Sequence, residues 1–214
     1  MTECCQIPDQ PLPRVVVVYG ATSLLLALAW HVSFPSGLWL MNALAGMLGI
    51  VLARSVLGAQ WQTVLGWSKS NLWLGLGVGL FMVAATQLAA RLMLPHLPFV
   101  LTETQRLYAR LDTPPGPLRA APIIWLVVLA EELVYRGVVT LRCARSLSTT
   151  RALLASTVLY VLPLTASGSW LLVVIGITVG ALWSYITLRS NGILASLVAH
   201  TMWSCSTFVA FRLA

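Results

Sequence analysis

The sequence predicts an all-α, polytopic membrane protein, a bundle of about seven transmembrane helices. Of its 214 residues, 58% are hydrophobic and only 9% are charged, and the mean hydropathy is +0.86. A soluble domain usually carries about 25% charged residues, and a disordered chain combines low hydrophobicity with high charge. Both of those classes are therefore excluded, and a membrane-embedded domain remains.

Seven apolar runs predict the spans in chain order. Most of them approach the roughly 20 residues that a helix needs to cross a bilayer, and the fifth is short because Pro163 is expected to end or bend it. The runs cover about 14–32, 37–57, 72–94, 119–141, 152–165, 169–188 and 193–211. We expect residues 1–13 to form a short polar tail and residues 14–214 to form a single membrane domain without internal repeats.

Two segments between these runs are more polar. Residues 54–70 contain Trp61, Trp67 and Lys69 and are typical of a segment at the membrane interface. Residues 95–118 predict a short surface helix that is followed by a helix-breaking run of Pro and Gly.

Small residues predict where helices approach closely. Gly75, Gly77 and Gly79 lie in the third run, and Gly176 and Gly180 form a G-x-x-x-G pattern in the sixth. We expect both groups to lie at helix–helix contacts.

The basic residues predict a membrane orientation rather than nucleic-acid binding. Twelve of the 13 are Arg, and they are scattered between apolar runs, where they act as topology signals and lipid headgroup contacts. With a cytoplasmic N-terminus, seven basic residues would face the cytoplasm and five the opposite side, which favours this orientation for a multi-pass protein. The short loops and the Arg bias suggest a prokaryotic plasma membrane. The seven are Arg14, Arg54, Lys69, Arg142, Arg145, Arg151 and Arg189, and the five are Arg91, Arg106, Arg110, Arg119 and Arg212.

The four cysteines predict neither a zinc site nor a disulfide framework, because their spacing fits neither. Cys4 and Cys5 are candidates for acylation, although a tail without function is the preferred interpretation. The other two are Cys143 and Cys205.

Only two carboxylates, Glu131 and Glu132, lie inside an apolar run. A charged residue at the centre of a bilayer costs about 2.5–3.5 kcal/mol on insertion scales, so ionisable residues in spans are taken as functional by default. Glu132 and Arg136 are four residues apart on one helix face and predict a buried ion pair. Adjacent helical residues point about 100° apart, so Glu131 should face elsewhere.

Burial disfavours a charged carboxylate, so Glu131 should take up a proton readily, as a general base acting on water must. The alternative is that Glu131, Glu132 and Arg136 form one inert polar clamp between helices. The residues leave both interpretations open.

His200 is the histidine that lies well inside a run, whereas His31 and His96 lie near span ends and are interpreted as structural. Counted from opposite membrane faces, Glu131 lies about 18 Å deep and His200 about 14 Å deep, so their side chains can meet near the middle of a core roughly 30 Å thick. Together they could hold and deprotonate a water. Ser204, one turn beyond His200, could donate a hydrogen bond to an oxyanion.

No metal or other cofactor is predicted. A catalytic zinc site takes three protein ligands, usually with two or more His or Cys, and His200 has no such companion at its depth. A Ser–His triad is weaker still, since only the Glu pair could orient His200.

The pattern Glu131-Glu132-x-x-x-Arg136-Gly137 inside a span resembles the first motif of the CPBP family, the CAAX-protease and bacteriocin-processing (Abi) intramembrane glutamic proteases. The stretch from Gly176 to Ser204, with its Leu-x-x-His200, is also similar, and the resemblance covers about residues 119–208. It implies that Glu131 activates the attacking water and that His200 shares this water or stabilises the transition state. It also implies that Glu132 and Arg136 support the site.

The resemblance implies substrates that are membrane-associated peptides: prenylated C-terminal motifs, leader or sorting segments, or C-terminal anchors. Two positions depart from the pattern. Tyr160 fits the aromatic residue of the second motif, but Leu164 stands where its His is expected, and Ser204 stands where the third motif usually has Asn. Tyr160 could act as a substitute donor.

Three functions remain open. The first is a membrane endopeptidase in which residues 14–94 wall off the site. The second is a catalytically inactive scaffold of the same family, for peptide binding, immunity or regulation. The third is a small transporter that uses Glu131 in proton coupling, which has less support because no inverted repeat is evident.

Overall fold

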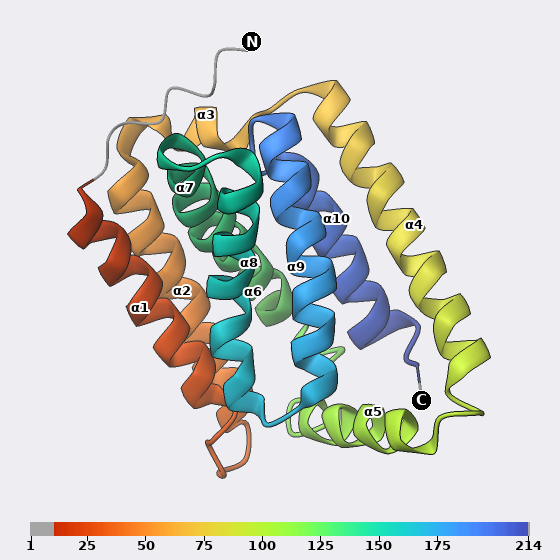
Figure 1. Ribbon diagram of the computed structural model, residues 1–214. Coiled ribbons are helices and arrows are strands. Elements are labelled where there is room, and N and C mark those ends of the chain that lie inside the picture. Colours follow the sequence, from red (N-terminus) through yellow and green to blue (C-terminus); the bar gives the residue numbers. More distant parts are fainter. Residues whose placement is uncertain (1–10, 214) are drawn as a thin grey trace.

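The structure is a computed structural model in which residues 11–213 are described, and within that range it contains helices and no strand (Figure 1). This confirms the predicted all-α class. Cys4 and Cys5, with most of the predicted tail, lie outside the described residues. The helices are α1 (Leu12–Ala29), α2 (Gly37–Leu57), α3 (Trp61–Leu65), α4 (Lys69–Met93), α5 (Pro98–Leu111), α6 (Ala121–Glu131), α7 (Leu141–Ser146), α8 (Thr149–Leu164), α9 (Trp170–Ser190) and α10 (Leu194–Cys205).

Among residues 11–213, five helical segments are long and apolar enough to cross a membrane, judged by length and composition. They include α1, α2, α4, α8 and α9. The fourth and seventh predicted spans are not among these five. The fourth contains Glu131, Glu132 and Arg136, and the seventh is shorter. The fourth continues from α6 through a π-helical segment, η2 (Glu132–Thr140), into α7, and the seventh is an apolar helical segment at Leu194–Ala210. The chain is thus a multi-pass membrane protein.

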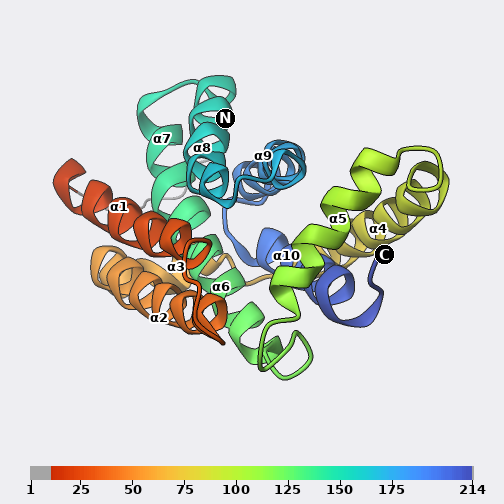
Figure 2. The ribbon, with the colours of Figure 1, turned by 90° about the horizontal axis from the view of Figure 1, so that it is seen from below.

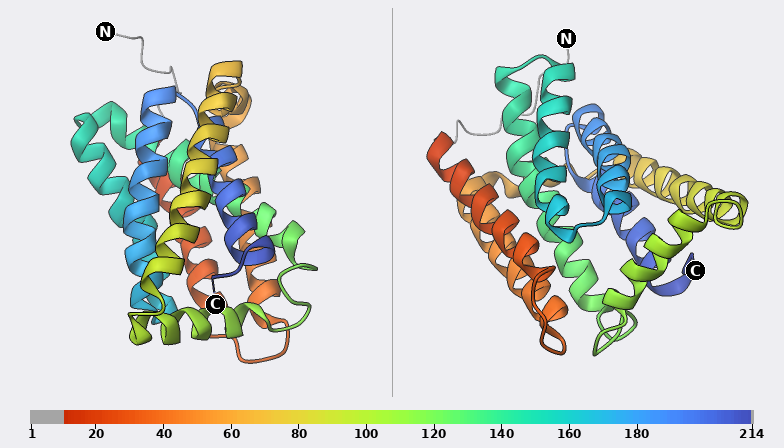
Figure 3. Two further views of the ribbon diagram at one scale, coloured as in Figure 1. Left: turned by 90° about the vertical axis from the view of Figure 1, so that its right-hand side faces the viewer. Right: turned by 60° about the horizontal axis from the view of Figure 1, so that its bottom comes forward.

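The continuous segment α6–η2 lies at the centre of the bundle. It contacts α1, α2, α8, α9 and α10, and α4 packs on the outer side of α10 (Figures 1 and 3). This placement explains why a segment with three ionisable side chains remains in the membrane, since Glu131, Glu132 and Arg136 are all buried among protein side chains.

The two ends of the bundle differ. One end, which we call the α7 face, holds the start of α1 together with α3 and α7, and the opposite end, the α5 face, is crossed by α5 (Figures 1 and 2). The predicted surface helix at 95–118 is therefore present as α5. Its Glu103 is only 4% exposed and is paired with Arg106 at 3.1 Å.

The glycines show where helices pack most closely. A Cβ on Gly180 would lie 2.5 Å from Cδ1 of Tyr160, and one on Gly176 would lie 2.5 Å from Cδ1 of Leu164, so the G-x-x-x-G face of α9 packs directly on α8. Gly75 and Gly79 pack in the same way on α10. The prediction for Gly77 was wrong, because nothing lies within 4 Å of its Cβ position. Being two residues from either neighbour, it points away from their face.

Gly180→Ala is expected to destabilise the protein, because its methyl group would collide with the ring of Tyr160. Overpacking of this kind typically costs about 1–3 kcal/mol. Gly77→Ala is the matched control and should be neutral or should stabilise by up to about 1 kcal/mol through helix propensity. Thermal unfolding of both purified variants in detergent measures the difference. Equal melting temperatures would contradict the close approach of α9 to α8.

Candidate active site

Glu131 and Glu132 lie where α6 changes into the π-helical segment η2. The wide turns continue through Thr140, whose hydroxyl donates a 2.7 Å hydrogen bond to the carbonyl oxygen of Tyr135, five residues earlier. Turns of this type are rare and frequently mark functional sites. The sequence analysis predicted an ordinary helix here.

Glu132 is fully buried and has a partner for each carboxylate oxygen. Its Oε1 lies 2.9 Å from Nδ1 of His200 and 3.6 Å from the guanidinium of Arg136, so the predicted ion pair is present. Its Oε2 accepts a 2.6 Å hydrogen bond from the hydroxyl of Ser196, which in turn lies 2.9 Å from the hydroxyl of Thr187. Glu132 is thereby fixed in one position.

Arg136 is also fully buried. Besides Glu132, its guanidinium meets the carbonyl oxygen of Gly180 at 3.3 Å and lies over the rings of Tyr160, at 4.1 Å, and Trp183, at 5.3 Å. A cation on aromatic faces in a water-poor site is stabilised by the negative face of each ring. Arg136 therefore connects η2 with α8 and α9.

Glu131 faces a cavity instead of the ion pair. One of its oxygens, Oε2, accepts a 3.1 Å hydrogen bond from the hydroxyl of Tyr160 and lies 3.8 Å from Nε2 of His200. The two adjacent carboxylates point in different directions, as the helix geometry predicts, but both lie next to the imidazole of His200. They reach the two nitrogens of the same imidazole from different sides.

One face of the His200 imidazole also packs against a neighbouring ring. The indole of Trp183 stacks on it with ring centroids 3.6 Å apart and an interplanar angle of 20°. Glu132 and Trp183 together fix the ring so that Nε2 faces Glu131. Ser204 lies one turn further along α10 and is buried at the edge of the same cavity.

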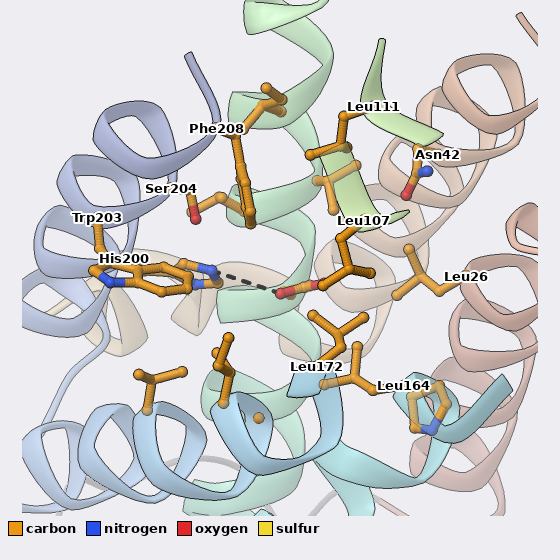
Figure 4. Close-up of a pocket in the computed structure, with 18 of the residues that line it drawn as sticks. Leu26, Asn42, Leu107, Leu111, Leu164, Leu172, His200, Trp203, Ser204 and Phe208 are labelled. Carbon is orange, nitrogen blue, oxygen red and sulfur yellow. Dashed lines mark ion pairs between the residues drawn. The ribbon is translucent and has the colours of Figure 1, made fainter. Parts of the chain in front are cut away.

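A cavity of about 170 Å³ begins at these residues and is lined by side chains from both halves of the chain (Figure 4). Its polar end is formed by Glu131, Tyr160, His200 and Ser204. Most of its remaining walls are apolar and come from α1, α2, α5, α6, α8, α9 and α10. The N-terminal half thus closes one side of the cavity through α1 and α2, whereas no residue of α4 lines it.

Trp183 and Ser196 were not predicted from the sequence as site residues. Ser196 carries a recognisable signal, because it lies four residues before His200 and so on the same helix face. Trp183 carries none, since it is one of nine tryptophans in an apolar chain. His31 and His96 lie exposed in the connections α1–α2 and α4–α5, outside the cavity.

Residues 114–206 match the family described as type II CAAX prenyl endopeptidase Rce1-like. Over these residues, the chain is similar to that family. The Rce1-like segment extends from the connection before α6 to the end of α10, so it contains Glu131, Tyr160, His200 and Ser204. No curated protein and no solved structure matches the chain.

The match confirms the resemblance that the motifs indicated, to a family described as endopeptidases. The Rce1-like segment supplies the polar end of the cavity, and the helices before it supply part of the apolar wall.

Proposed function

We propose that the chain is an intramembrane endopeptidase of the glutamic type, in which Glu131 activates the water that attacks the peptide bond. The observation that carries this proposal is the convergence of Glu131, Tyr160 and His200 at one apolar cavity. An enzyme that cleaves peptides within a membrane needs a base that takes a proton from water and a donor that stabilises the carbonyl oxygen of the substrate. Both groups must lie next to a space that the substrate can enter.

The charges of the site support this assignment. With His200 protonated and both carboxyls ionised, the charges of Glu131, Glu132, Arg136 and His200 sum to zero. They also sum to zero when one proton resides on Glu131 and His200 is neutral. When Glu131 takes a proton from water, the four side chains gain one positive charge, and the negative charge that forms on the carbonyl oxygen of the substrate compensates it in the low-dielectric site.

The reaction begins when Glu131 takes a proton from water and the oxygen bonds to the carbonyl carbon of the substrate. The carbonyl oxygen then carries a negative charge, which Nε2–H of His200 and the hydroxyl of Ser204 would stabilise. The carbon–nitrogen bond breaks when the proton held by Glu131 passes to the leaving nitrogen. Glu132 and Arg136 act by holding His200, and Tyr160 acts by holding Glu131.

The experiment that tests this proposal compares protein termini in cells that carry the wild-type protein or Glu131→Gln at equal membrane abundance. New termini next to membrane segments that vanish with Glu131→Gln would identify the substrates. Identical terminal profiles would contradict the proposal.

A catalytically inactive scaffold of the same family is the second candidate, and one observation favours it. Leu164 lies in the cavity wall at the position where the family's second motif is expected to have His. If the terminal profiles match while deletion of the protein still gives a phenotype, the scaffold function is the correct one.

We also propose that the α7 face is cytoplasmic in a plasma membrane. The positive-inside rule supports this orientation, since seven basic residues lie towards the α7 face and five towards the α5 face. A membrane-impermeant maleimide should then label Thr102→Cys, on α5, in intact cells, and should label Thr150→Cys only after lysis. The reverse pattern would show the opposite orientation.

A further inference from the structure

We propose that Tyr135 is a positioning residue: held by two side chains of α1, its ring fixes the ring of Tyr160, so that the Tyr160 hydroxyl reaches Glu131. This inference rests on the proposed function and adds a role for a helix that lies outside the Rce1-like segment. Tyr135 does not line the cavity, so it acts on the reaction through its neighbours and not through the substrate.

The hydroxyl of Tyr135 is deeply buried and has a partner on another helix. Tyr135 lies on η2, four residues after Glu131, and is only 1% exposed. Its hydroxyl lies 2.9 Å from the hydroxyl of Ser23, which is buried in α1. A buried hydroxyl costs free energy unless it is hydrogen-bonded. The bond to Ser23 removes that cost in one position of the ring and thereby ties Tyr135 to α1.

Tyr19 contacts the same ring from α1 as well. It lies four residues before Ser23 and so on the same helix face, and its ring meets that of Tyr135 edge-on, with centroids 6.0 Å apart and an interplanar angle of 83°. Its hydroxyl donates a 3.1 Å hydrogen bond to the carbonyl oxygen of Leu159, the residue before Tyr160. Helix α1 therefore contacts both the aromatic neighbour of Tyr160 and the backbone next to it.

The position of the Tyr160 ring is set by close neighbours. The ring of Tyr135 meets it edge-on, with centroids 5.1 Å apart and an interplanar angle of 79°, and the guanidinium of Arg136 lies 4.1 Å from its centroid. In this position the Tyr160 hydroxyl lies 3.1 Å from Oε2 of Glu131. A hydrogen bond of this length is lost when the ring moves by about 1 Å. The contact with Glu131 therefore depends on where Tyr135 is held.

The first test is a double-variant cycle of Tyr135→Phe with Tyr160→Phe. Tyr135→Phe keeps the ring and removes only the hydroxyl, and the Ser23 hydroxyl that it leaves behind can bond to a carbonyl of its own helix, so the variant should fold. We expect kcat for a cleaved peptide to fall about 5- to 10-fold, which corresponds to the loss of one buried hydrogen bond, with KM unchanged. In a Tyr160→Phe background the same change should have almost no effect, because no Tyr160 hydroxyl is left to position.

Tyr108→Phe is the matched control. Tyr108 is also buried, its hydroxyl donates a 2.8 Å hydrogen bond to the carbonyl oxygen of Thr207, and it lies on α5 outside the cavity. This variant should cleave the peptide at the wild-type rate. A wild-type kcat in Tyr135→Phe, or an equal loss with and without Tyr160→Phe, would overturn the proposal, and the proposed function would stand as long as cleavage depends on Glu131. A loss of the same size in Tyr108→Phe would also overturn the proposal, because any buried hydroxyl would then have this effect.

The second test observes the ring of Tyr160 directly and does not depend on turnover. A fluorotyrosine replaces Tyr160 in the full chain, and the fluorine NMR spectrum of the purified protein in detergent is recorded with and without Ser23→Ala, which leaves both tyrosine rings in place. Ser23→Ala should shift or split the resonance, because Tyr135 no longer holds the neighbouring ring in one position, whereas Tyr108→Phe should leave it unchanged. Tyr135→Phe serves the same measurement if Ser23→Ala does not fold.

A resonance that these changes at Ser23 or Tyr135 leave unaltered would overturn the proposal. An altered resonance in a protein that shows no Glu131-dependent cleavage would uphold the positioning of Tyr160 and contradict only the protease function.

Discussion

Replacing Glu131 with Gln is expected to lower kcat/KM for a cleaved peptide by about 10²–10⁴-fold, the usual contribution of a general base. Gln has the size of Glu and can still accept the 3.1 Å hydrogen bond from Tyr160. It cannot take a proton from water. The loss should therefore appear in kcat, with the folded structure unchanged, and single-turnover cleavage by the purified protein in nanodiscs measures it.

Glu103→Gln is the matched control for this prediction. Glu103 is also buried and also paired with an Arg, but it lies on α5 and does not line the cavity. The Glu103→Gln variant should cleave the peptide at the wild-type rate. If Glu131→Gln also cleaves at the wild-type rate while its melting temperature is unchanged, Glu131 is not the base and the inert polar clamp is the better interpretation of the pair.

The spans could be predicted from the sequence because each depends on a long local signal. The predicted run at 37–57 coincides with α2, and the predicted G-x-x-x-G face of α9 packs on α8. A run of about 20 apolar residues has few alternatives to a transmembrane helix. The π-helical turns of η2 could not be predicted in this way, since they depend on contacts that Glu132 and Arg136 make with three other helices.

The charged members of the site could also be predicted, because charge is rare and costly in an apolar span. Glu131, Glu132, Arg136 and His200 stand out for that reason. Their mutual arrangement was only partly predictable: the i,i+4 pair follows from helix geometry, but the meeting of both carboxylates at one imidazole follows from how α10 packs on α6.

The uncharged members show the limit of such reasoning. Trp183 determines the orientation of His200 through a 3.6 Å ring stack, but an aromatic side chain in an apolar span is indistinguishable from ordinary packing. Tyr160 was found through the family pattern rather than through its own chemistry. The hydrogen bond that it donates to Glu131 gives a physical reason for an aromatic hydroxyl at that position.

Arg136→Leu is expected to destabilise the protein by about 3–5 kcal/mol, because it leaves the buried carboxylate of Glu132 without its cation. The side chain of Glu132 is fully buried, so water cannot replace the lost partner. The carbonyl oxygen of Gly180 and the rings of Tyr160 and Trp183 would lose their contacts with the guanidinium as well. Thermal unfolding in detergent measures the loss. Arg212→Leu is the control, because the side chains of Arg212 and its partner Asp112 are 31% and 49% exposed, so this change should cost no more than about 1 kcal/mol.

The double variant Glu132→Leu/Arg136→Leu separates the structural role of this pair from its role in positioning His200. Replacing both members of a buried ion pair with apolar residues is often neutral for stability, so much of the loss should be recovered. Activity should not be recovered, because Nδ1 of His200 loses the carboxylate that lies 2.9 Å away and that holds the ring towards Glu131. If the double variant regains both stability and cleavage, the pair is only a clamp. If it stays as unstable as the single variant, the unpaired charge is not the cause of the instability.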